Sequence, residues 1–195
     1  MYTILLALSL NGLVFTFDDG PSPKTTPYIL NILKKHNVKA VFCWPSVNLR
    51  GKERIAIAKR AIREGHTLCN HSYSHPNFSK ISIKRQLYEM KRSMRDYKRI
   101  LNYRPKFFRP PCGVVTRTMR RYAALHGMKI LIWHWRLDSH DWKPRTTSSQ
   151  MYNHIIKGWL YLRKRGLGGI ALFHDYRMKT LKIIEKIIIR VKRGP

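Results

Sequence analysis

The feature that most constrains this chain is a regular alternation of short apolar runs with longer amphipathic stretches. The apolar runs predict strands over residues 13–17, 40–43, 67–70, 107–108, 129–135 and 169–173. In the stretches that follow them, apolar residues recur every three or four positions, which predicts helices over 25–36, 53–64, 83–101, 116–126, 148–164 and 179–191. Such strand–helix units in succession are typical of an α/β fold, with parallel strands in a doubly wound sheet or a barrel.

The chain is long enough for one domain, and its composition agrees with a folded core. Of its 195 residues, 44% are hydrophobic, which excludes wholesale disorder. No linker divides the sequence, so we predict one domain over residues 12–195, preceded by an apolar extension over residues 1–11. The extension lacks a basic start, and we favour an uncleaved extra strand over a secretion signal. No apolar run approaches the roughly 18–20 residues that cross a bilayer.

Charge gives a second constraint. The chain has 39 Lys and Arg residues against 10 Asp and Glu, and a formal net charge of +29, which favours an anionic polymer as a partner. Half of the acidic residues nevertheless lie in three short clusters: Asp18 with Asp19, Asp138 with Asp141, and Asp175. Clustered carboxylates are costly unless a metal, a cation or a shared proton compensates them, so we expect chemistry at these clusters.

A histidine pair adds to the first acidic cluster. His71 and His75 are four residues apart, a spacing that would place both rings on one face of a helical turn. One Asp with two His is a sound ligand set for a catalytic divalent metal. Helix capping by Asp18 or Asp19 and two surface histidines are the ordinary structural alternatives; the pairing of the two motifs favours a metal site.

Three further polar clusters follow later strands. They are Arg109 in RPPCG, residues 138–142 (DSHDW) and residues 172–175 (LFHD). Each has an ordinary alternative: Arg109 as a surface charge, Trp142 as a core residue and His174 as a buried, satisfied histidine. Because active sites in α/β folds assemble at the carboxyl ends of the strands, we expect these clusters to form one site.

The segments TFDDGP, HSYSHP, RPPCG, DSHDW and LFHD resemble, in this order, the five motifs of the polysaccharide deacetylase family, the NodB-homology group known as carbohydrate esterase family 4. The similarity extends over about residues 14–189. It implies a distorted (β/α) barrel of the seven- or eight-stranded type. It also implies a hydrolase that removes N-acetyl groups from N-acetylglucosamine-containing polysaccharide (chitin, chitooligosaccharide or peptidoglycan) and releases acetate. Such a substrate implies an extracellular or wall-associated protein.

The resemblance also assigns roles to residues. It makes Asp19, His71 and His75 the ligands of one divalent ion, with zinc as the first choice and cobalt or nickel as alternatives. It makes Asp18 the general base, with Arg109 paired to it. His174 would protonate the leaving amine, oriented by a carboxylate that we assign to Asp141 in preference to Asp138. A backbone N–H near Cys112 would stabilise the developing oxyanion, and Trp142 and Leu172 would line the sugar groove.

The chain departs from the family pattern in two ways. Cys43 and Cys112 stand where aromatic residues are usual, and the chain stops at residues 193–195, where relatives continue into another strand. Without that strand the sheet would have an exposed edge, which we expect residues 1–10 to cover. The three cysteines, Cys43, Cys69 and Cys112, are too few for a disulfide framework.

Two alternatives remain open. One is a basic protein that binds an anionic polymer, nucleic acid or acidic glycan, on a catalytically idle barrel, although the sequence contains no recognisable nucleic-acid-binding motif. The other is an acetyl-xylan-type esterase. We expect a monomer whose main partner is an N-acetylated polysaccharide, with electrostatic association with anionic polymers as a second interaction.

Overall fold

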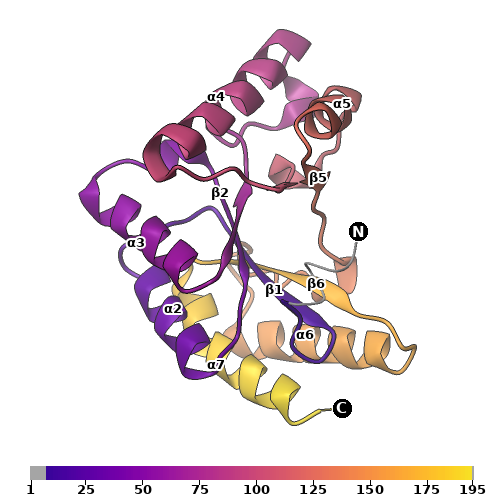
Figure 1. Ribbon diagram of the computed structural model, residues 1–195. Helices are drawn as coiled ribbons and strands as arrows, with labels where there is room; N and C mark the ends of the chain where they lie inside the picture. The colour runs from indigo at the N-terminus through magenta and orange to yellow at the C-terminus, as the bar shows by residue number, and fades with distance from the viewer. Residues whose placement is uncertain (1–7, 195) are drawn as a thin grey trace. The chain divides into compact units, whose positions relative to one another are not determined.

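The computed structural model describes residues 8–194 (Figure 1). The expected N-terminal extension therefore lies largely outside the described residues. The chain forms two compact units. Of the described residues, unit 1 contains 8–18, 22–41 and 133–194, and unit 2 contains 19–21 and 42–132. Within the described part of the chain, no helix combines the length and apolar character needed to span a bilayer.

Unit 1 is built on two parallel strands, β1 (Leu13–Asp18) and β6 (Gly169–His174). Their register runs from Leu13 opposite Gly169 to Asp18 opposite His174. Aromatic rings of the two strands pack together in the core, which also receives the apolar faces of α2 (Thr26–Lys35), α6 (Ser148–Arg163) and α7 (Met178–Lys192). The register places Asp18 and His174 side by side where both strands end.

Unit 2 contains four neighbouring strands in the order β5-β4-β3-β2. They are β2 (Val41–Trp44), β3 (Thr67–Asn70), β4 (Phe107–Phe108) and β5 (Lys129–Ile130). The helices are α3 (Lys52–Arg63), α4 (Ile83–Leu101) and α5 (Arg117–Leu125). A buried cluster that includes Phe78, Met90, Phe108 and Met119 joins α4 and α5 to the sheet. It exists because α4 and α5 carry apolar residues every three or four positions.

The predicted α/β class is confirmed, and the predicted elements appear within one residue of their expected ends, with one exception. The strand predicted over 129–135 is wrong beyond Ile130. The Leu131 N–H still donates to the Phe108 carbonyl at 2.9 Å, but β4 ends at Phe108 and offers no further partner. Residues 135–137 instead form a 3-10 turn, η4 (Trp135–Leu137), whose Arg136 N–H is capped by the His134 ring.

Candidate active site

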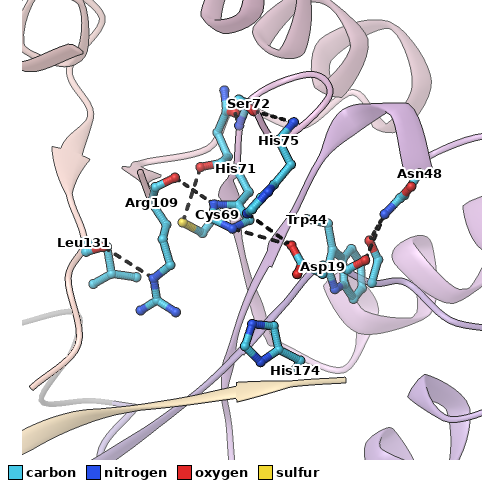
Figure 2. A network of polar contacts seen from close by, with 12 residues as sticks. Asp19, Trp44, Asn48, Cys69, His71, Ser72, His75, Arg109, Leu131 and His174 are labelled. Carbon is cyan, nitrogen blue, oxygen red and sulfur yellow. Dashed lines mark hydrogen bonds and ion pairs between the residues drawn. The ribbon is translucent and has the colours of Figure 1, made fainter. Parts of the chain in front are cut away.

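Three side chains of unit 2 converge in a way that suits a metal ion (Figure 2). Asp19 Oδ1 lies 3.6 Å from His71 Nε2 and 3.5 Å from His75 Nε2. The three ligand atoms all lie within 4.8 Å of one another, and the two imidazole rings meet edge to face at 4.6 Å. One carboxylate and two imidazoles at this spacing can chelate a single divalent cation and leave positions for water and substrate.

The loop that carries the two histidines is not helical, so the predicted helical turn over residues 71–75 is wrong. Ser72 and His75 both have left-handed backbone conformations, with φ of 65° and 59°. Side chains hold this shape: the Ser72 N–H donates to Asn70 Oδ1 at 2.9 Å, and the His75 N–H donates to Ser72 Oγ at 3.0 Å. Such local bonds to side chains compete with helix formation, and here the folded-back loop brings both rings to Asp19.

Asp19 reaches these rings because the chain turns sharply after β1. Its φ is 70°, its N–H donates to the Cys43 carbonyl at 3.1 Å and its carbonyl accepts a bond from the Asn48 amide at 2.8 Å. The preceding residue, Asp18, is the last residue of β1 and is buried. Two consecutive carboxylates therefore have different surroundings, which allows them different chemical roles.

His71 is held in the form that binds a metal. Its Nδ1 lies 2.7 Å from the Arg109 carbonyl, so Nδ1 carries the proton and Nε2 faces Asp19 with a lone pair. Burial, followed by the neighbouring His75, lowers the pKa of His71 to about 3. The ring is therefore neutral at pH 7, as metal coordination requires.

Arg109 and Cys112 lie in the segment after β4. Arg109 is fully buried, which contradicts the alternative of a surface charge, and its Nε donates to the Leu131 carbonyl at 3.3 Å. Cys112 has a left-handed φ of 56° within η3 (Pro111–Gly113), and its thiol is exposed. The backbone bonds of this turn run from Gly113 to Pro110 and from Val114 to Pro111, so neither uses the Cys112 N–H.

In unit 1, His174 pairs with Asp141. The two bonds are His174 Nδ1 to Asp141 Oδ1 at 2.6 Å and the His174 N–H to Asp141 Oδ2 at 2.7 Å. Thr180 on α7 donates to the same Oδ2. Burial raises the pKa of Asp141, but the bonds from His174 and Thr180 outweigh burial and hold that pKa below its ordinary value. Asp138, the other candidate, instead accepts the His140 N–H at 2.9 Å.

The remaining predicted residues of unit 1 differ in exposure. Trp142 is 46% exposed and so offers an aromatic face, whereas Leu172 is 3% exposed and has almost no free surface. Asp175 is buried and accepts bonds from Thr25 and Thr26, which ties the end of β6 to the start of α2.

Sequence reasoning missed two residues that hold site side chains. Thr180 orients Asp141, as described above. Glu89 on α4 is fully buried and accepts the Ser74 N–H at 2.7 Å, the Ser74 hydroxyl at 2.8 Å and a guanidinium bond from Arg85 at 2.8 Å. Ser74 lies between Ser72 and His75, so Glu89 fixes the histidine loop. The only sequence signal was its place on the apolar face of α4, where a carboxylate is unusual.

Residues 10–131 match the family model described as polysaccharide deacetylase. A peptidoglycan-N-acetylglucosamine deacetylase of Bacillus cereus is 32% identical over 180 residues, which cover 91% of this chain and 62% of that protein. The peptidoglycan-N-acetylmuramic acid deacetylase PdaC of Bacillus subtilis is 31% identical over 176 residues, covering 90% of this chain and 35% of that protein. The chain thus spans less than two thirds of the length of these two relatives.

Solved structures agree with the sequence match. The structure of Bacillus subtilis PdaC aligns with a TM-score of 0.79 and 28% identity over 93% of this chain and 83% of that chain. BA3943 of Bacillus anthracis, described as a CE4 family pseudoenzyme, aligns with a TM-score of 0.80 and 26% identity over 95% of this chain and 62% of that chain. Because one fold carries both active and inactive relatives, activity has to be argued from the site residues.

Proposed function

This chain belongs to the polysaccharide deacetylase family, and we propose that it is a metal-dependent hydrolase that removes N-acetyl groups from an N-acetylglucosamine-containing polysaccharide and releases acetate. The observation that carries the proposal is the convergence of Asp19, His71 and His75, with the Arg109 carbonyl fixing the proton of His71 on Nδ1 and burial keeping that ring neutral. Peptidoglycan is the first substrate to test, because the relatives named above are peptidoglycan deacetylases.

The three side chains fit one divalent cation. Both His Nε2 atoms face the same oxygen of Asp19, and His71 has the carbonyl partner on Nδ1 that metal-bound histidines usually have. Zinc is our first choice, and cobalt and nickel suit the same ligands. When bound, such an ion acidifies a coordinated water toward a pKa of about 7 and polarises the acetyl carbonyl.

We assign proton transfer to residues at the ends of β1 and β6. Asp18, which directly precedes Asp19 in the chain, would take a proton from the attacking water, and Arg109 would keep that carboxylate ionised. His174, the register partner of Asp18, would deliver a proton to the leaving amine. Asp141 would stabilise the protonated imidazole through the bond to Nδ1.

Binding groups complete the proposal. A backbone N–H at Cys112 would donate to the carbonyl oxygen as negative charge develops there, and the thiol that replaces the usual aromatic residue does not affect a main-chain donor. Trp142 would pack against the apolar face of a sugar ring, and its 46% exposure leaves the ring available. With 3% exposure, Leu172 would contribute little to such a groove.

The direct test is acetate release from peptidoglycan fragments, with a neutral chitooligosaccharide and an acetylated xylan in parallel. We expect acetate from the first two substrates and a loss of activity with chelator. Asp18→Asn should lower kcat by roughly 10²–10⁴-fold, the usual contribution of a general base. Glu53→Gln, which changes an exposed carboxylate on α3, is the matched control and should leave kcat unchanged. Full activity in Asp18→Asn would refute the base assignment, and acetate from xylan alone would favour the esterase.

A second candidate function has one observation in its favour. A groove of about 1070 Å³ lies between α4 and α5, and its lining includes the five cations Lys91, Arg95, Lys98, Arg99 and Arg104. A polyanion could bind there in a salt-dependent way without any chemistry. Tight polyanion binding by a chain that releases no acetate in the assay above would favour this function over hydrolysis.

A further inference from the structure

A small pocket in unit 1 is lined in part by the two residues that directly precede Asp141 in the chain. Its volume is about 370 Å³, and seven residues line it: Ser139, His140, Lys143, Arg145, Thr146, Gln150 and His154. Every one of these side chains carries a group that can donate a hydrogen bond, and two are cations at neutral pH. None of the seven is a carboxylate or an apolar residue, so the lining suits an anionic, hydroxyl-bearing ligand.

His154, one of the lining residues, has a ring atom without a partner. Its Nε2 is buried and has no hydrogen-bond partner among the described residues. The backbone of Trp135 lies close enough to this ring to influence its pKa. Burial, followed by the nearby His140, lowers the pKa of His154, so the ring is neutral and its Nε2 is available for a hydrogen bond to a ligand. A ligand hydroxyl, which can both donate and accept, would satisfy this buried atom.

The loop around the pocket is fixed before any ligand binds. Lys179 on α7 donates to the carbonyls of Lys143 at 3.1 Å and Pro144 at 2.7 Å. Thr147 and Gln150 form a reciprocal cap at the start of α6, in which the Gln150 side-chain oxygen accepts and its NH₂ group stays available as a donor. The cationic residues 143 and 145 are therefore carried on a braced loop rather than a free one.

A metal is a poorer occupant of the same place. His140 and His154 lie with their ring centroids 4.9 Å apart, and Asp138 Oδ2 is 4.0 Å from His140 Nε2. Among the described residues, however, the group whose ligand atoms gather within 4.8 Å is Asp19 with His71 and His75, not this one. The two cations in the lining, Lys143 and Arg145, would also repel a metal ion.

We propose that this pocket binds a carboxylate-bearing sugar unit of the glycan, next to the N-acetyl sugar that is hydrolysed. Lys143 and Arg145 bind the carboxylate, and a hydroxyl of the same unit forms a hydrogen bond with His154 Nε2. The proposal rests on the proposed function, because His140 and Ser139 directly precede Asp141 in the chain and so place the pocket beside the proton-donating pair. N-acetylmuramic acid, with its lactyl carboxylate, has the required chemistry.

The test compares one glycan in two charge states. The substrate is a muramic-acid-containing oligosaccharide with its carboxylate free or converted to the methyl ester, and a neutral chitooligosaccharide serves as reference. In the wild type we expect KM to be about tenfold lower for the free acid than for the ester. In the Lys143→Gln/Arg145→Gln double variant we expect that ratio to approach one, while kcat and KM for the neutral chitooligosaccharide stay unchanged.

Total charge needs its own control. Lys157→Gln/Lys164→Gln removes the same two charges from exposed positions of α6 and its end, and it should keep the wild-type ratio of KM values. A double pocket variant that discriminates acid from ester as well as the wild type does would overturn the proposal. So would an equal loss of discrimination in the control, because that would assign the effect to overall charge.

A binding measurement separates this proposal from the proposed function. Titration calorimetry with the acid and the ester reports on the pocket even if no acetate is released. Nuclear magnetic resonance of the His154 ring should show a shift on adding the acid and a smaller one on adding chitooligosaccharide. If the wild type binds the acid and the double pocket variant binds it more weakly, the proposed pocket is supported whatever the activity. Equal affinity of the wild type for the acid and the ester refutes the pocket.

Discussion

Replacing Asp141 by asparagine is the substitution whose consequences the structure defines most closely. Asp141 is 1% exposed, and its two oxygens accept three hydrogen bonds, two from His174 and one from Thr180. An asparagine of the same shape keeps one oxygen for the His174 N–H and Thr180, but presents an NH₂ group to His174 Nδ1. One charge-assisted bond is lost, which costs about 1.5–3 kcal/mol of unfolding free energy.

The pH dependence of this cost has a defined sign. The pKa of Asp141 is below its ordinary value in the folded protein, so its carboxylate contributes stability above the unfolded pKa near 4. That contribution is lost as the pH falls through the lowered folded pKa. The difference in unfolding free energy between wild type and Asp141→Asn should therefore be largest at pH 6–7 and shrink below about pH 4. Because the amide cannot stabilise a protonated His174, kcat should fall roughly 10²–10⁴-fold.

Urea unfolding at pH 7 and pH 3, together with acetate release at pH 7, measures both effects. Asp138→Asn is the control, because Asp138 belongs to the same motif but accepts the His140 backbone N–H and not His174. It should change kcat much less. A kcat loss in Asp138→Asn that matches or exceeds that of Asp141→Asn would refute the role assigned to Asp141, and so would a stability cost of Asp141→Asn that grows toward low pH.

Three further predictions concern stability and the histidine loop. In metal-free folded protein, His71 stays neutral down to its pKa of about 3, whereas in the unfolded chain it becomes protonated below about pH 6.5. The unfolding free energy should therefore decrease as the pH is lowered below about 6.5, by up to about 1.4 kcal/mol per pH unit. His71→Gln should remove this contribution in urea titrations. Glu89→Ala should lower the unfolding free energy by about 2–3 kcal/mol, because the Ser74 donors lose their carboxylate partner. It should also weaken zinc binding about tenfold in calorimetry. Gly158→Ala should destabilise α6 by about 1–3 kcal/mol in thermal unfolding, although alanine normally favours helices, because its Cβ would lie 2.1 Å from the Arg136 carbonyl oxygen.

The elements of the fold could be predicted from the sequence because each depends on its own pattern. α4 carries apolar residues along one face over its whole length, and β1 and β6 are apolar runs with polar residues at their ends. The end of β5 could not be predicted, since residues 131–135 are as apolar as a strand. That strand stops because β4, its partner, is two residues long, and a partner's length is not visible in the segment itself.

The composition of the candidate site could likewise be predicted, but its local geometry could not. The spacing of His71 and His75 predicts a helical turn. In the structure the two rings converge because the loop has residues in left-handed backbone conformations, which hydrogen bonds to Asn70 and Glu89 hold in place. The choice of Asp141 over Asp138 agrees with the hydrogen bonds to His174, but in the sequence it depended on family resemblance. Supporting residues such as Asn70 and Glu89 cannot be found from sequence motifs, because they act through tertiary contacts.

The most direct test of the account is a metal titration of the chelator-stripped protein with acetate release as the readout. Zinc should restore acetate release from peptidoglycan fragments in proportion to occupancy and saturate at one ion per chain, and His75→Ala should bind zinc at least tenfold more weakly. Wild-type protein that shows full activity with no detectable bound metal, or that binds zinc unchanged after His75→Ala, would contradict the account.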